Sequence, residues 1–214
     1  ALSVIDQPND AMLKHYTDQV YKNTPYQKMS ESVAESEPGN PIPGKLGETS
    51  PIKHVFYIIK ENRTYDQVLG DMKEGNGDSS LVLFGEKVTP NLHNIARQFV
   101  LLDNFCVNAE VSCDGHNWTM GAYANDYLEK TWPTYYSDRG DFYSGEGGHP
   151  MGNNKNGFFW DACKRAGVTF RSYGEFLERN SKRVIRPTIP VLADHFCTNF
   201  EPWDVITAWD LGYL

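Results

Sequence analysis

The sequence lacks long apolar runs and any surplus of basic residues. No unbroken apolar run exceeds a handful of residues, and a membrane-spanning helix needs about 20 of them, so no transmembrane helix is expected. Lys and Arg number 20 against 28 Asp and Glu, which gives a formal net charge of -8. Because a protein needs a basic face to bind a phosphate backbone or an anionic lipid surface, nucleic acid and anionic membranes are disfavoured as partners.

Closely spaced cysteine pairs are also missing. The four cysteines stand at positions 106, 113, 163 and 197 with no CxxC spacing, so a zinc ribbon is not expected. Their even number permits two disulfides, but the spacing does not say which would pair. The sequence opens Ala-Leu-Ser with neither an initiator Met nor a signal peptide, which suggests a processed or excised piece of a longer protein.

What is present is enough for one substantial core. The chain has 214 residues, 40% of them hydrophobic and 13% aromatic, which predicts one domain or at most two. Residues 1–50 are expected to hold a helix, starting after an N-cap at Asn9 or Asp10, and then an acidic linker rich in Pro and Gly. Residues 51–214 are expected to form the main domain.

Residues 54–66 are the most informative stretch. Five successive apolar residues at 55–59 predict a strand that is covered on both faces. Glu61 and Asn62 follow the carboxyl end of this strand. In open α/β sheets ligands bind outside the carboxyl ends of strands, so this carboxylate and amide are candidate ligands for a hard cation. The alternative is that the same residues form a solvated turn.

Further elements alternate between helix and strand. Residues 64–69 are expected to begin a short helix, and residues 89–99 to form a helix with Thr89 as N-cap and Pro90 in the first turn. Residues 100–105 are expected to form a second strand. A strand, helix, strand succession is typical of a parallel α/β fold.

The helix predicted over residues 89–99 has one apolar face. Its expected buried stripe consists of Leu92, Ile95, Ala96 and Phe99. His93 lies off that stripe and is expected to be an exposed helix residue.

A third helix and strand are expected near the end of the chain. Residues 158–167 predict a helix with a Gly stop, and residues 168–173 predict another strand. Glu175 would then fall at a carboxyl strand end. There it could contact a substrate or serve as a solvated turn residue.

Ser112 precedes a helix that is predicted from Asn117 onward. A hydroxyl at a helix amino terminus faces unpaired backbone N–H groups and the positive end of the helix dipole. Both stabilise an alkoxide and an incoming phosphoryl or sulfuryl oxygen. The alternative is that Ser112 is an N-cap. Because Ser112, Glu61 and Asn62 would share one sheet edge, a metal at the latter pair could activate the serine as a nucleophile.

Two motifs resemble a known family. Residues 61–66, Glu-Asn-Arg-Thr-Tyr-Asp, resemble the Glu-Asn-Arg-Ser/Thr-Phe/Tyr-Asp signature that opens the phosphoesterase family of bacterial phospholipases C and acid phosphatases. That family belongs to the alkaline phosphatase superfamily. The segment from Ser112 through Gly115 and His116 to Gly121 and Ala122 resembles the nucleophile segment of cofactor-independent phosphoglycerate mutases, in the same superfamily.

The resemblance implies roles for particular residues. It makes Glu61 and Asn62 metal ligands and Ser112 the covalent nucleophile, and it places His116 and Asn117 near the phosphate oxygens as substrate-binding residues. It covers about residues 50–210 and implies a three-layer α/β/α sandwich with a mainly parallel central sheet, incomplete at its carboxyl end.

The implied activity is metal-dependent hydrolysis of phosphate esters through a phosphoserine. The cofactor would be a divalent cation, Zn²⁺, Mn²⁺, Mg²⁺ or Ca²⁺, and the substrate a small-molecule or lipid phosphate ester. Two alternatives stay open: an inactive surface binding or structural module with the same fold, and a phosphotransferase or mutase. The amino-terminal segment resembles the exit from a β-propeller in bacterial two-domain surface proteins, which implies an adjacent propeller domain and a periplasmic or extracellular location.

The sequence departs from the superfamily in its second half. Members complete the metal site with late Asp and His ligands. After Ser112 this chain offers His149 and the pair Asp194 and His195, in contexts that do not match the late motifs. Either the pair Asp194 and His195 supplies the missing ligands, or the chain is an amino-terminal fragment that carries half a metal site and is inactive.

Overall fold

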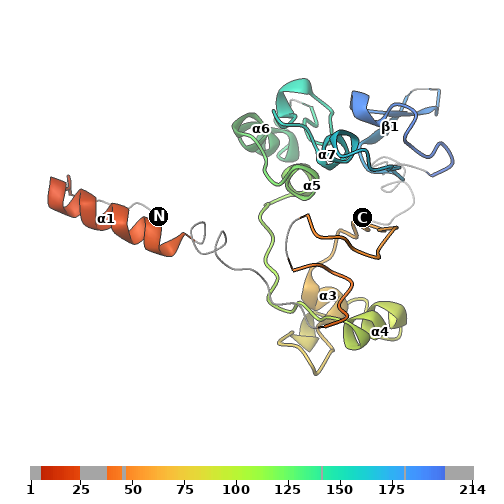
Figure 1. Cartoon of the computed structure of the whole chain (residues 1–214), viewed down its shortest axis with the longest axis horizontal. Coiled ribbons are helices and arrows are strands. Elements are labelled where there is room, and N and C mark those ends of the chain that lie inside the picture. The colour runs from red at the N-terminus through yellow and green to blue at the C-terminus, as the bar shows by residue number, and fades with distance from the viewer. Residues whose placement is uncertain (1–5, 25–37, 45–46, 141, 181, 201–214) are drawn as a thin grey trace. The chain divides into compact units, whose positions relative to one another are not determined.

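The computed structural model describes residues 6–24, 38–44, 47–140, 142–180 and 182–200 (Figure 1). The chain divides into two compact units, residues 1–61 and residues 62–214. In the structure, the boundary between the units falls after Glu61. The boundary predicted from the change in composition lies near residue 50. The strand-like residues 2–5 and most of the predicted linker lie outside the described residues.

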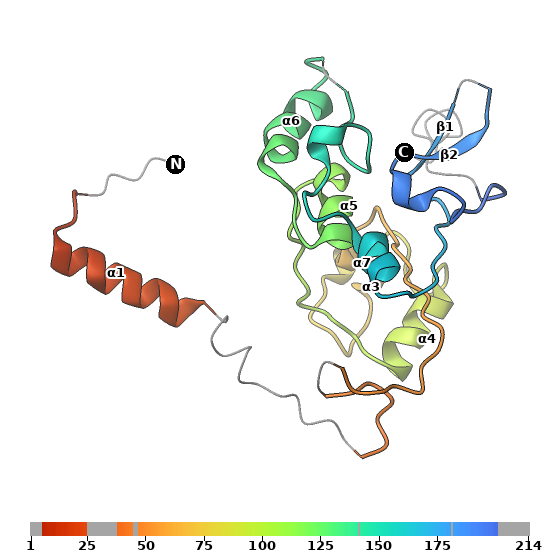
Figure 2. The same ribbon diagram turned by 45° about the horizontal axis from the view of Figure 1, so that its top comes forward.

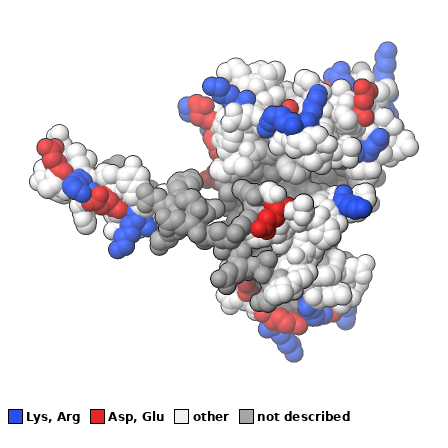
Figure 3. Space-filling view, viewed as in Figure 1, with Lys and Arg blue, Asp and Glu red and all other residues white. Residues whose placement is uncertain are grey.

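The first unit contains one helix, α1 (Asp10–Asn23), among its described residues. The side chain of Asn9 accepts a hydrogen bond from the backbone N–H of Met12 at 2.9 Å, so the predicted helix and its N-cap are confirmed. No residue of α1 is buried, and its surface carries charges of both signs, including a pair between Lys14 and Asp18 at 2.7 Å (Figure 3).

The strand predicted at residues 55–59 is absent. The segment has no regular secondary structure, and the side chains of Val55, Phe56 and Ile58 are 80%, 89% and 81% exposed. An apolar run becomes a strand only where another strand supplies hydrogen-bond partners for its backbone. Among the described residues, no such partner pairs with this segment.

The predicted three-layer α/β/α sandwich is therefore wrong. The one sheet in the described part of the chain has two strands, β1 (Leu177–Arg179) and β2 (Ile185–Pro187), which pair antiparallel. Residues 100–105 form no strand. In the segment 168–173, Ser172 makes an isolated parallel bridge with Phe196. The rest of the fold consists of helices and irregular segments, so no parallel sheet edge gathers the predicted site residues.

The second unit begins with three short helices. They are α3 (Tyr65–Leu69), η1 (Ser79–Leu81) and α4 (Pro90–Gln98). Thr64 caps α3 by accepting from the N–H of Gln67, whose side chain accepts from the N–H of Thr64 in return. The helices predicted at residues 64–69 and 89–99 are confirmed.

His93 on α4 is fully buried, although the apolar pattern predicts that it is exposed. Its Nδ1 lies 2.9 Å from the carbonyl oxygen of Thr89, and its Nε2 lies 2.8 Å from Oδ1 of Asp71. Ile95 and Phe99, which belong to the predicted stripe, are 55% and 71% exposed. A polar ring is tolerated inside a protein when both nitrogens have hydrogen-bond partners, and here they do.

The remaining helices among the described residues of the second unit follow residue 111. They are α5 (Ser112–Gly121), α6 (Asp126–Tyr136), η2 (Pro150–Gly152), α7 (Phe159–Arg165) and η3 (Pro190–Leu192). Helix α5 lies beside α6, α6 contacts η2, and α7 contacts η3 (Figure 2). The ring of Phe176 is fully buried, with the rings of Phe158 and Trp160 at 4.6 Å and 5.2 Å between centroids.

Two other expectations from the sequence concern membrane-spanning helices and disulfides. Within the described residues, no helix has the length and apolar character that crossing a membrane requires. All four cysteines are free thiols, so neither of the permitted disulfides is formed.

Candidate metal centre

Helix α5 carries three of the predicted site residues. It begins at Ser112, and the N-cap position is Val111. The carboxylate of Asp114 accepts hydrogen bonds from the backbone N–H groups of Glu110 and Val111, both at 3.1 Å. The helix therefore starts five residues before the predicted position at Asn117, because an acidic side chain in its first turn takes up backbone donors.

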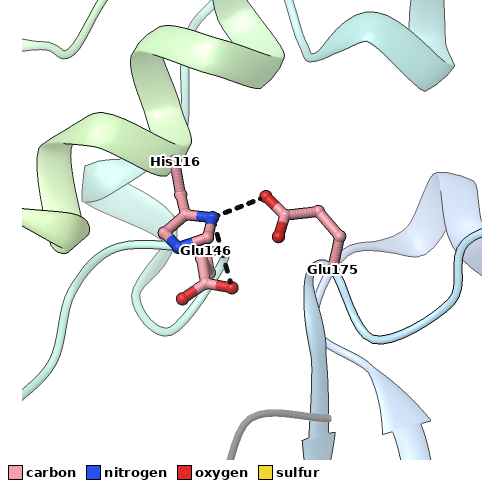
Figure 4. A group of neighbouring side chains, drawn as sticks. All are labelled: His116, Glu146 and Glu175. Carbon is pink, nitrogen blue, oxygen red and sulfur yellow. Dashed lines mark hydrogen bonds and ion pairs between the residues drawn. The ribbon is translucent and has the colours of Figure 1, made fainter. Parts of the chain in front are cut away.

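His116 projects from α5 toward two glutamates from distant segments. Its Nδ1 lies 2.9 Å from Oε1 of Glu175 and 4.0 Å from Oε1 of Glu146. Figure 4 shows both carboxylates approaching this same ring nitrogen. The side chains of His116, Glu146 and Glu175 are 12%, 23% and 17% exposed, so the group is shielded from bulk water and still reachable.

Glu146 is held by the protein at several atoms. Its backbone has a positive φ of 49°, a conformation that costs energy in a non-glycine residue and has to be maintained by its surroundings. Its N–H donates to Oδ1 of Asn117 at 3.3 Å, its carbonyl oxygen accepts from the hydroxyl of Thr188, and its Oε2 accepts from the hydroxyl of Tyr143 at 2.8 Å. These contacts fix both the backbone and the carboxylate.

Asn117 connects the loop to the helix. It is fully buried, accepts from Glu146 through Oδ1, and donates through Nδ2 to the carbonyl oxygen of Gly152 at 2.8 Å. Glu146 and the end of η2 are thus both attached to α5. Asn117 is better described as a residue that positions Glu146 than as a direct contact to a substrate.

Glu175 is presented by a tight turn before β1. The hydroxyl of Ser172 donates to the carbonyl oxygen of Glu175 at 2.6 Å, and the next residue, Phe176, has a φ of 53° and a fully buried ring. Burying that ring in the core while the chain turns directs the preceding carboxylate toward α5.

The three side chains form a group that could hold a cation. One ligand atom from each residue lies within 4.8 Å of the other two. Ligand atoms at about 2.0–2.2 Å from a tetrahedral Zn²⁺ lie about 3.4 Å apart, so Glu146, at 4.0 Å, would have to approach Nδ1 of His116, and Glu175, at 2.9 Å, would have to move away from it. The hydrogen bond between His116 and Glu175 would give way to metal ligation in that movement.

The donor set favours certain cations. Ca²⁺ and Mg²⁺ bind mainly through oxygen ligands, whereas imidazole nitrogen suits Zn²⁺ and other transition metals. One imidazole with two carboxylates is therefore better matched to Zn²⁺ or Mn²⁺ than to Ca²⁺.

Two groups beside the centre stay in their neutral forms. Burial raises the pKa of the Cys113 thiol to about 11, so this residue next to Ser112 is not a thiolate at neutral pH. Burial, together with the negative charge of Glu146, also raises the pKa of the Tyr143 hydroxyl. Tyr143 therefore keeps its proton, and its hydroxyl donates a hydrogen bond to the carboxylate of Glu146.

The structure groups the predicted site residues only in part. Ser112, His116 and Asn117 lie on one helix, and residues four apart on a helix lie on the same face, so Ser112 and His116 are neighbours along α5. Glu61 and Asn62 are exposed, and they fall on opposite sides of the division between the two units. Their role as metal ligands stays a prediction.

The late ligand candidates do not join the group among the described residues. His149 caps η2 and its ring stacks on Tyr127, while Asp194 and His195 are exposed. Glu146 is a site residue that the sequence reasoning missed. Its signal was the run Gly-Glu-Gly-Gly at 145–148, in which flanking glycines permit the close packing that the loop requires.

Comparisons with known proteins found no relative of this chain. No protein-family model matches the chain, and neither a curated protein nor a solved structure matches it.

Proposed function

We propose that the protein is a metal-dependent hydrolase of phosphate esters, with Ser112 as nucleophile and a divalent cation bound by His116, Glu146 and Glu175. The observation that carries the proposal is the convergence of one ligand atom from each of the three side chains within 4.8 Å, one of them on the helix that begins at Ser112. The resemblance of residues 61–66 and 112–122 to phosphate-ester enzymes supports the choice of substrate class.

The chemistry follows from the position of Ser112 at the first position of α5. The positive end of the helix dipole would stabilise the oxygens of a bound phosphoryl group. A cation bound one turn away would neutralise phosphoryl charge. Attack of Oγ of Ser112 on phosphorus forms the phosphoserine and breaks the bond to the alcohol, which leaves with the hydroxyl proton. Water then releases phosphate and restores the serine.

The direct test is hydrolysis of p-nitrophenyl phosphate and bis(p-nitrophenyl) phosphate in the presence of Zn²⁺ or Mn²⁺. Ser112→Ala should lower kcat by at least about 10³-fold, because no other group supplies the covalent step. Trapping with labelled substrate at low pH should yield a phosphoserine in the unaltered protein and none in the variant. Unchanged turnover in Ser112→Ala would remove the serine from the mechanism.

A second function is favoured by the hydrogen bond between His116 and Glu175. This contact links α5 to the segment before the hairpin, as expected of a structural or binding module that has no turnover. In that case Ser112→Ala changes no measurable property, and neither substrate is hydrolysed. A phosphotransferase would instead pass the phosphoryl group to an added alcohol, which product analysis with glycerol as acceptor would detect.

A further inference from the structure

Thr188, which follows directly after β2, contacts both segments that supply the carboxylates. Its hydroxyl oxygen lies 2.5 Å from the carbonyl oxygen of Glu146 and 2.9 Å from the carbonyl oxygen of Phe176, the residue after Glu175. Its backbone N–H also donates to the carbonyl oxygen of Phe176, at 3.0 Å. A hydroxyl has one proton, so the two carbonyl oxygens share it. One side chain therefore joins the segment of Glu146 to that of Glu175.

The two residues whose carbonyl oxygens contact Thr188 both have a positive φ. The angle is 49° at Glu146 and 53° at Phe176. Such a conformation costs energy in a non-glycine residue and persists only where neighbouring groups maintain it. Because Glu175 directly precedes Phe176, the backbone at Phe176 sets the path of the chain at Glu175. The hydrogen bonds of Thr188 thus support the two backbone positions that direct the carboxylates.

A glycine allows Thr188 to approach this closely. A Cβ on Gly147, the residue after Glu146, would lie 2.6 Å from Oγ1 of Thr188, and φ at this glycine is 76°. A side chain at this position would push the segment of Glu146 away from the hydroxyl. The position of Gly147 beside a ligand candidate is therefore explained by the contact with Thr188.

The spacing of the two segments matters because both carboxylates approach the same atom. Oε1 of Glu175 and Oε1 of Glu146 lie 2.9 Å and 4.0 Å from Nδ1 of His116. A relative shift of either backbone changes these separations directly. Groups that hold metal ligands in place without touching the ion commonly change its affinity by about 10–100-fold when they are removed.

We infer that Thr188 is a positioning residue of the metal centre, which sets the spacing of the Glu146 and Glu175 carboxylates through their backbones. The inference rests on the cation site within the proposed function. It does not depend on Ser112 or on any turnover, since the affinity of the metal-free protein for a cation measures it.

The test is calorimetric titration of the metal-free protein with Zn²⁺. Thr188→Val removes the hydroxyl and keeps a branched side chain of similar shape, and it should weaken binding by about ten-fold. Thr188→Ser keeps the hydroxyl, and it should bind within about two-fold of the unaltered protein. Thr89→Val is the matched control, because the Thr89 hydroxyl also contacts two carbonyl oxygens, those of Phe84 and Gly85, and it should leave the affinity unchanged.

Far-UV circular dichroism checks that each variant is folded. A role in stability alone would lower the urea midpoint of Thr188→Val without changing the Zn²⁺ affinity of the folded protein. Rescue of the affinity by Thr188→Ser and the unchanged affinity of Thr89→Val separate positioning from such a general effect.

Amide hydrogen exchange tests the same connection in the unaltered protein. If opening at Thr188 breaks the metal centre, a free Zn²⁺ concentration of about ten times Kd should slow exchange of the Thr188 amide by about ten-fold. The amide of Leu13, which donates to the carbonyl oxygen of Asn9 in the first unit, is the internal control and should exchange at the same rate.

The outcomes separate this inference from the proposed hydrolase. If Thr188→Val binds Zn²⁺ as tightly as Thr89→Val, or if Zn²⁺ does not slow exchange at Thr188, the residue has no positioning role, whatever the hydrolysis assays give. If the unaltered protein binds no Zn²⁺, the inference and the cation site both fail. If the affinity depends on the Thr188 hydroxyl but no phosphate ester is hydrolysed, the inference stands and the proposed hydrolase fails.

Discussion

Nδ1 of His116 lies 2.9 Å from Oε1 of Glu175, a residue 59 positions later in the chain. With Glu146 beside them, this contact brings three separate segments of the second unit to one point. Each glutamate is also held by a hydrogen bond within its own segment, Glu146 through the hydroxyl of Tyr143 and Glu175 through the hydroxyl of Ser172.

The first prediction concerns cation binding. Glu146→Gln and Glu175→Gln should each weaken Zn²⁺ or Mn²⁺ binding by at least about ten-fold, because each removes one charged ligand while keeping the shape of the side chain. Calorimetric titration of the metal-free protein measures this. Glu129→Gln, at an exposed position on α6, is the control and should bind as the unaltered protein does. Equal affinities in all four proteins would exclude the centre.

The second prediction concerns Tyr143. Tyr143→Phe removes only the hydroxyl that donates to Oε2 of Glu146, so the fold should be retained while metal affinity falls by about ten-fold. Residues that support a ligand usually have effects of this size. Far-UV circular dichroism checks the fold, and the same titration checks the affinity. An affinity equal to that of the unaltered protein would mean that the carboxylate needs no support from Tyr143.

The third prediction concerns the pH dependence of stability. Burial alone would lower the pKa of His93, but its hydrogen bonds with Asp71 and Thr89 outweigh burial and raise it. The hydrogen bond with His93 lowers the pKa of Asp71. The contribution of His93 is therefore complete below its unfolded pKa of about 6.5 and lost as pH rises through its folded pKa. The contribution of Asp71 is present above about 3.9 and lost as pH falls through its folded pKa.

Asp71→Asn tests this pair. At pH 5 both groups are charged, and the variant should lose about 1 kcal/mol of unfolding free energy, a value reduced by the partial exposure of Asp71. At pH 9 the loss should be smaller, since His93 loses its charge as pH rises through its folded pKa. Urea unfolding at the two pH values gives the comparison, and an equal loss at both would show that the charge of the histidine does not contribute to the difference.

The fourth prediction compares two glycines. A Cβ on Gly145 would lie 2.6 Å from the carbonyl oxygen of Cys113, so Gly145→Ala should destabilise the protein by about 1–3 kcal/mol and displace the neighbouring Glu146. A Cβ on Gly115, inside α5, meets only Cβ of Ala109 at 3.5 Å. Gly115→Ala should therefore stabilise the protein by up to about 1 kcal/mol through helix propensity. Thermal unfolding measures both, and a stable Gly145→Ala would contradict the packing described.

Three of the helices could be predicted from the sequence because their signals are local. Asn9 before α1, Thr64 before α3 and Pro90 at the start of α4 each mark a helix end within a few residues. The strands could not, because an apolar run such as residues 55–59 does not specify whether a pairing partner is present. The fold class was inferred from those runs. Because the runs form no strands, the predicted fold class is also wrong.

The candidate site was predictable in the same uneven way. His116 was predicted as a substrate-binding residue and not as a metal ligand, and Glu175 was placed near a ligand-binding position, although the strand expected before it is reduced to one bridge. Glu146 was missed, because the glycines around it do not reveal the positive φ or the contacts with distant residues such as Thr188 on which its role depends. The burial of His93 depended similarly on Asp71, 22 positions earlier, which no local pattern reveals.

The exposed apolar run at residues 55–58 has a consequence for the behaviour of the protein at high concentration. Such a run combines β-branched and aromatic side chains without proline, the composition that promotes intermolecular β pairing. Lys53 and Lys60 stand at its two ends and are exposed. Positive charges in these positions oppose the stacking of one copy on another, so the two lysines act as gatekeepers against aggregation.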